Sequence, residues 1–82
     1  MNRASVETAY CFFHQKQRVY QYSTMDWQKD DIECAISAYA DGMDHELYQQ
    51  LAGSRTDFLL NHDRFGEDLL SAVEQMEQMM GF

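Results

Sequence analysis

The sequence contains no proline and only four glycines among its 82 residues. An all-β sandwich or barrel needs turn residues at short intervals, so this scarcity argues against both. It suits helices joined by short turns. Hydrophobic residues make up 45% of the chain, which favours folding over disorder, and two separate domains would each be too small to bury a core. We therefore expect residues 1–82 to form a single all-helical domain.

Cysteines and long apolar runs are also scarce. The two cysteines, Cys11 and Cys34, are too few for a disulfide framework. Each falls among apolar residues of an expected helix, so we expect both to be small buried hydrophobes. No apolar run approaches the roughly 20 residues of a membrane span, and no basic-then-apolar segment typical of a signal peptide opens the sequence. We expect a cytoplasmic protein that does not contact a membrane.

Positively charged residues are also scarce. The sequence has 6 Lys and Arg residues and 14 Asp and Glu residues, which gives a net charge of −8. Residues 1–22 carry three basic residues and one acidic residue, a net of +2, which leaves −10 for residues 23–82. Binding a phosphate backbone needs clustered Lys and Arg, so we expect no direct contact with nucleic acid. An acidic surface attracts basic partners.

Hydrophobic periodicity predicts four helices, and the clearest covers residues 26–40. Its apolar residues form two stripes rather than the single stripe of an ordinary surface helix. Two stripes predict neighbours on two sides, so we place this helix at the middle of the bundle. Ser23 or Thr24 is its expected N-cap, and Gly42 is the expected left-handed residue after its C-terminus.

The first predicted helix runs from Ser5 to about Tyr22. Residues 18–22 are rich in strand formers, which leaves a β-hairpin as the competing interpretation. A tight hairpin would need Gly, Asn or Asp in its turn, and residues 14–17 supply none of these. The helix is therefore favoured.

The remaining two predicted helices follow Gly42. A short one is capped by Asp44 and ends at Gly53. The last covers residues 55–80 behind a Ser54 cap, with one apolar face throughout and Asp68 on the polar face. A break near Asp63 would divide this helix and give a fifth. The expected fold class is a small all-α bundle of four helices, with that division left open.

Three groups of polar residues have the spacing of metal ligands or of acid–base pairs. Glu7, Cys11 and His14 share one side of the first helix, a spacing at which helices present metal ligands, but a fourth ligand would have to come from a distant segment. Two further groups could form acid–base pairs, and these are His62–Asp63 with Glu67, and Asp30–Asp31. No phosphate loop, nucleophile elbow or paired-ligand motif accompanies them. We expect no enzymatic activity, no metal and no cofactor.

Aromatic residues are plentiful, with five Tyr, five Phe and one Trp. Tyr22 and Trp27 fall outside the best-defined apolar faces, and such residues are favoured at interfaces. Met76, Met79 and Met80 gather at the end of the last helix, where flexible side chains could adapt to a partner or cap the chain's own core. These five residues form the predicted interface.

The functional hypothesis is a small acidic interaction or regulatory module. Its partner is a protein, and the chain itself, as a homodimer joined through aromatic and Met helix faces, is the first candidate. The alternative is an acidic inhibitor that mimics nucleic acid in a basic groove of another protein. The net charge of −10 over residues 23–82 motivates that alternative, which requires carboxylates in rows near phosphate spacing.

Overall fold

The computed structural model describes residues 2–81 as four α-helices and one 3₁₀ turn. In chain order these are α1 (Arg3–Tyr22), α2 (Asp26–Gly42), α3 (His45–Ala52), η1 (His62–Arg64) and α4 (Phe65–Met80). Within residues 2–81 there is no strand. The predicted all-α bundle is confirmed, and the hairpin considered for residues 18–22 is wrong because α1 continues through them.

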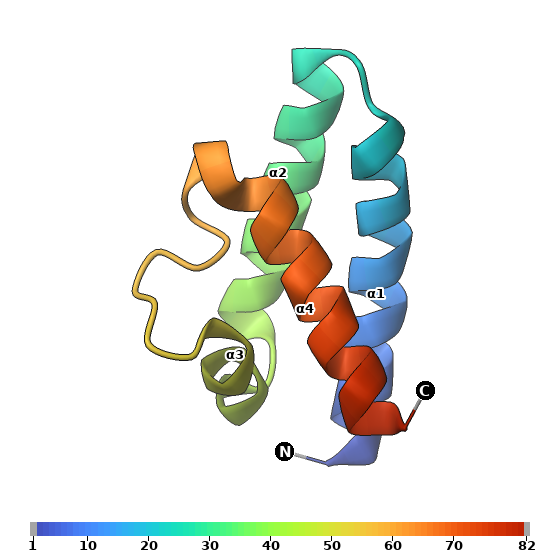
Figure 1. Cartoon of the computed structure of the whole chain (residues 1–82), viewed down its shortest axis with the longest axis vertical. Helices are drawn as coiled ribbons and strands as arrows, with labels where there is room; N and C mark the ends of the chain where they lie inside the picture. The colour runs from blue at the N-terminus through green and yellow to red at the C-terminus, as the bar shows by residue number, and fades with distance from the viewer. Residues whose placement is uncertain (1, 82) are drawn as a thin grey trace.

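The helix at the middle of the bundle is α4, not α2. In Figure 1, α1 and α2 run as a pair and α4 crosses in front of them, with α3 to one side. The core-facing side of α4 carries its buried residues, which are Phe65, Asp68, Leu69, Ala72, Val73, Met76 and Met80. Only Ile32 and Ile36 are buried on α2. The second stripe of α2, which contains Trp27, Cys34 and Ala38, faces solvent, and for that reason the prediction of a central α2 was wrong.

Both cysteines are free and exposed, which corrects the expectation that they are buried. On α1 the buried residues include Ala9 and Phe13. Cys11 lies two residues from each, about 200° around the helix, and so points away from the core. Cys34 has the same relation to Ile32 and Ile36 on α2.

The start of α1 and the cap of α2 differ from the expectations, although α2 begins at Asp26 as predicted. Asn2 caps α1, its side-chain oxygen accepting from the Ser5 backbone N–H at 2.9 Å, so the helix begins before Ser5. Residue 25 precedes α2 without a side-chain capping bond. Ser23 does not cap α2, because its hydroxyl donates to the Val19 carbonyl at 2.8 Å and closes the end of α1.

The boundaries around α3 follow the sequence more closely. Asp44 caps α3 as predicted, accepting from the Leu47 N–H at 3.1 Å. Gly53 ends the helix at a φ of 61°, a conformation that favours glycine. Gly42 is instead the last residue of α2 and does not have a positive φ. The left-handed ending predicted there was wrong.

The last predicted helix is divided. Residues 55–61 are irregular and helical structure resumes only at η1, so the predicted helix was wrong over its first quarter and Ser54 caps nothing. The alternative of a separate start near Asp63 is closer to the structure. Phe58 and Leu59 are both buried, and Leu59 has a φ of 62°. A right-handed helix cannot contain that conformation.

A buried carboxylate holds this irregular segment against α4. Asp68 is only 3% exposed, although the sequence placed it on a polar face. Its carboxylate accepts from the Leu59 backbone N–H at 3.1 Å and pairs with Arg55. Arg55 also pairs with Asp57 at 3.0 Å. The network fixes the chain that leads into η1.

Candidate functional site

Exposed apolar side chains gather at the end of the bundle where α1 passes into α2. We call Val19, Tyr22, Met25 and Trp27 the α1–α2 tip. Their exposed fractions are 53%, 77%, 54% and 60%, and the turn that carries them is at the top of Figure 1. The tip contains the predicted residues Tyr22 and Trp27.

The last turn of α1 explains why the tip is exposed. Tyr20 turns inward, and its ring centroid lies 5.2 Å from that of Phe65 at the start of α4. At 100° per residue, Val19 and Tyr22 then point away from α4. Tyr22 and Val19 also line a shallow hollow of about 370 Å³ together with Arg18, Ser23 and Gln28.

Val19 and Met25 are not among the five residues predicted for the interface. Met25 lies just before α2, where its sulfur accepts from the Trp27 indole N–H at 3.1 Å. Their position at or close to the interhelical turn is the signal that could identify them.

The predicted methionines do not join this surface. Met76 and Met80 are 0% and 8% exposed, because they continue the core-facing stripe of α4. Met76 and Met80 therefore pack in the core of this chain, and the expectation that they lie at an interface is wrong. Met79 is 37% exposed, but it lies near the C-terminal end of α4, at the opposite end of the molecule from the tip (Figure 1).

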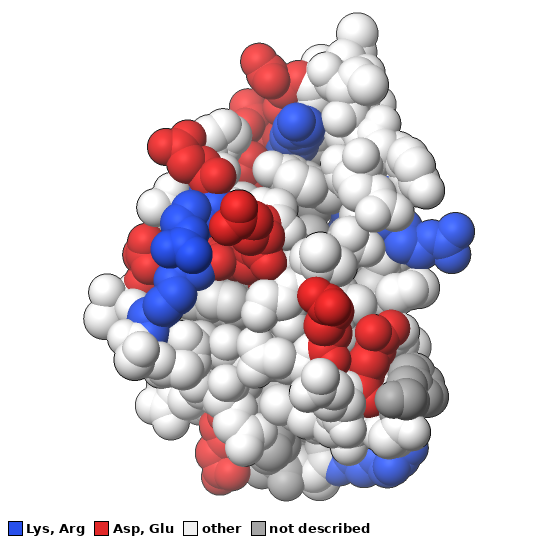
Figure 2. All heavy atoms as spheres, in the orientation of Figure 1, with Lys and Arg blue, Asp and Glu red and all other residues white. Residues whose placement is uncertain are grey.

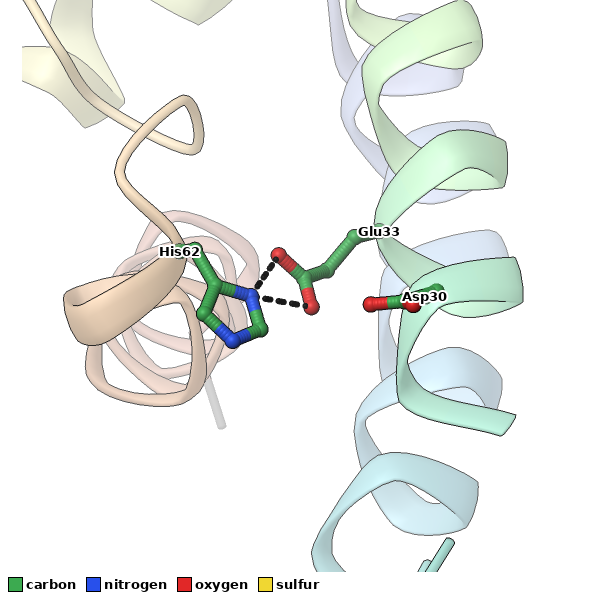
Figure 3. A group of neighbouring side chains, drawn as sticks. All are labelled: Asp30, Glu33 and His62. Carbon is green, nitrogen blue, oxygen red and sulfur yellow. Dashed lines mark hydrogen bonds and ion pairs between the residues drawn. The ribbon is translucent and has the colours of Figure 1, made fainter. Parts of the chain in front are cut away.

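A second group of side chains brings together segments far apart in the sequence. Asp30 and Glu33 lie one turn apart on α2, and His62 in η1 points toward them (Figure 3). Nδ1 of His62 is 2.9 Å from each carboxylate oxygen of Glu33. One ligand atom from each of the three residues lies within 4.8 Å of the others. We call these residues the α2–η1 cluster.

The carboxylates of this cluster raise the pKa of two neighbouring side chains. The hydrogen bond to Glu33 and its negative charge raise the pKa of His62 above its ordinary value. Burial, followed by the charges of Glu33 and Asp30, raises the pKa of Tyr20 on neighbouring α1. The His62 side chain is 69% exposed and that of Glu33 is 17% exposed. The cluster therefore opens to solvent on the histidine side and is anchored on α2.

The sequence placed these residues in two separate pairs, Asp30–Asp31 and His62–Asp63. The fold joins one member of each pair and adds Glu33, a residue outside both pairs. The spacing of Asp30 and Glu33 at i and i+3 was the available signal, since residues so spaced are neighbours on a helix. The approach of η1 was not visible in the sequence.

The metal-like spacing on α1 does not form a site. Glu7 pairs with Arg3 at 2.9 Å, and the His14 ring stacks on Tyr10 with centroids 5.2 Å apart. Within residues 2–81, the α2–η1 cluster is the one group of three potential metal ligands that converge.

A comparison with protein-family models, curated proteins and solved structures finds no match. Among the helices in residues 2–81, none has the combined length and hydropathy needed to cross a membrane. Function must therefore be inferred from the surface of the chain itself.

Proposed function

We propose that this chain is a small interaction module that associates reversibly with a second copy of itself through the α1–α2 tip. The observation that carries the proposal is the concentration of four exposed apolar side chains on one turn. At roughly 200 Å² for a whole Tyr or Trp side chain, the exposed parts of the four together present roughly 500 Å². Apolar patches of this size on soluble proteins are often functional.

The charges beside the tip favour a second copy as the partner. Arg18 lies next to the tip on α1 and Asp26 lies next to it on α2, and both are exposed. Within residues 2–81, neither forms an ion pair. In a two-fold arrangement the same patch meets itself, so Arg18 of each copy can face Asp26 of the other. The tip is thus self-complementary in charge as well as apolar.

The size of the patch indicates a weak dimer. A standard stable interface buries roughly 800 Å² on each partner, and the tip offers less. The net charge of −8 on each chain adds repulsion, which salt screens. We therefore expect a dimer that forms at high protein concentration and dissociates on dilution.

Sedimentation equilibrium over micromolar to millimolar concentrations tests the proposal. The apparent mass should rise from 9.7 kDa toward twice that value, and the double variant Tyr22→Ser/Trp27→Ser should remain monomeric. Leu60→Ser is the matched control, because Leu60 is 65% exposed but lies in the segment between α3 and η1. A wild-type mass that stays at the monomer value, or a tip variant that still dimerises, would refute the proposal.

A charge exchange tests the two-fold pairing itself. Arg18→Glu should weaken the dimer by placing two acidic groups opposite each other, and Arg18→Glu/Asp26→Arg should restore it. Failure of the double variant to recover would contradict the pairing of Arg18 with Asp26, even if the apolar tip remains the contact.

The alternative, an acidic inhibitor of a protein with a basic groove, rests on the acidity of residues 23–82. Figure 2 shows Lys and Arg lying among Asp and Glu over the segment between α3 and α4. Arg55, paired with Asp57 and Asp68, interrupts the acidic surface there, which makes it less like a row of phosphates. Salt-sensitive binding of the monomeric chain to a basic protein would favour this alternative over self-association.

A further inference from the structure

The three side chains of the α2–η1 cluster come from two structural elements and face one common point. Glu33 and Asp30 project from successive turns of α2, and the His62 ring presents Nδ1 to them from η1 (Figure 3). Neither acidic residue alone would define a site. The convergence of an imidazole nitrogen with two carboxylates from another element is the specific feature.

We propose that Asp30, Glu33 and His62 bind a divalent transition-metal ion, and that Zn²⁺ fits their chemistry best. Zinc takes imidazole nitrogen and carboxylate oxygen as ligands, and sites with three protein ligands leave a fourth position for water. Magnesium and calcium prefer sites made of oxygen alone, and calcium requires six to eight ligands. One nitrogen donor and two carboxylates therefore select against both.

The distances between donor atoms approach those around a zinc ion. Zinc bonds to nitrogen and oxygen are about 2.0–2.2 Å long, so donors around a tetrahedral ion lie roughly 3.3–3.5 Å apart. In the structure the His62 and Glu33 atoms are 2.9 Å apart, and all three donors lie within 4.8 Å. The ion would require His62 and Glu33 to separate by about half an ångström and the more distant donors to approach by up to roughly 1.3 Å. The exposed side chains of His62 and Asp30 can make these movements.

Negative charge beside the cluster favours a cation. Asp63, beside His62, adds negative charge near the imidazole. Lys29 offsets part of it, because its Nζ lies 5.9 Å from the centroid of the neighbouring Tyr20 ring. The ion would replace the proton that His62 shares with Glu33, as binding of a metal to histidine requires. It would thereby link η1 to α2 across 29 residues of chain.

Calorimetric titration of the metal-free, tag-free protein with Zn²⁺ at pH 8 tests the site. We expect one ion per chain, a rise in melting temperature, and at least a tenfold loss of affinity in His62→Gln and in Glu33→Gln. His45→Gln is the matched control, since His45 is also exposed and bonds only within α3 to Gln49. Titration with Mg²⁺ should show far weaker binding.

Two further measurements separate this site from other zinc ligands. The exposed cysteines could bind zinc elsewhere, so Cys11→Ser/Cys34→Ser must retain the affinity of the wild type. Imidazole nitrogen NMR spectra should place the ion on Nδ1 of His62. The proposal is overturned if no saturable binding occurs below 1 mM Zn²⁺, if His62→Gln binds as tightly as the wild type, or if the cysteine variant loses the ion.

Discussion

Replacement of Asp68 by alanine should destabilise the fold more than replacement of any exposed carboxylate. Asp68 is 3% exposed, and it is the acceptor for the Leu59 backbone N–H at 3.1 Å. Leu59 is itself buried and has a φ of 62°, so its N–H cannot find a helical partner or reach water. The substitution leaves that donor without an acceptor.

The magnitude follows from these contacts. A buried backbone donor without a partner costs about 1–3 kcal/mol. Loss of the ion pair between Arg55 and Asp68 adds little to this cost. The Arg55 side chain is 25% exposed and retains its pair with Asp57, and partly exposed pairs contribute weakly to stability. Relaxation of the left-handed Leu59, which holds about 1–2 kcal/mol of strain, can recover part of the loss. We expect Asp68→Ala to lower the free energy of unfolding by about 2 kcal/mol, or the melting temperature by about 8–16 °C.

Urea denaturation followed by circular dichroism measures the global effect, with Asp31→Ala as the control because Asp31 is exposed on α2. Amide hydrogen exchange at Leu59 provides the local measurement, since its protection depends on Asp68. If Asp68→Ala and Asp31→Ala are equally stable and the Leu59 amide remains protected, Asp68 does not hold the segment and the reasoning fails.

Three further predictions follow from single features. Gly42→Ala should stabilise the protein by about 0.5–1 kcal/mol in urea denaturation, because the added Cβ meets nothing within 4 Å; destabilisation would contradict the helical φ at this residue. Arg55, then Asn61, lower the pKa of Asp57 below its ordinary 3.8, so the stabilisation of the wild type relative to Asp57→Asn should be complete above about pH 5 and disappear as the pH falls through the lowered pKa; a difference that is independent of pH down to about 2 would exclude the pairing. Both cysteines are exposed and should react with a thiol reagent in the native protein, whereas a need for denaturant would show that one is buried.

Local chemistry made part of the fold predictable. The period of the apolar residues identifies α1, α2, α3 and all of α4, although the last predicted helix begins too early. Asp44 is recognisable as a cap because its side chain needs only the backbone three residues later. The tip residues Tyr22 and Trp27 were identified for a similar reason, since a residue outside the apolar period of its own helix has no core position to occupy. These inferences need no knowledge of how the helices pack.

The errors concern features that depend on packing between segments. The left-handed Leu59 is compensated by Asp68, nine residues further along the chain. A leucine gives no local sign of such a conformation, and an aspartate in the first turn of a helix normally indicates favourable interaction with the helix dipole. The hydrogen-bond partner of His62 is more distant still in the sequence, because Glu33 lies 29 residues before it.

The central position of α4, which the sequence pattern predicted for α2, explains where the candidate sites lie. Helix α4 supplies more buried side chains than any other helix, and α2 is attached to the core through Ile32, Ile36 and the partly buried Tyr39. The rest of its first two turns is then free to carry Trp27 toward the tip and Asp30 and Glu33 toward η1. The second apolar stripe, first interpreted as a second packing face, is the part of α2 that the core does not require. Both proposals therefore draw on α2, one on Trp27 of the second apolar stripe and the other on Asp30 and Glu33 outside that stripe, and their tests depend on different side chains.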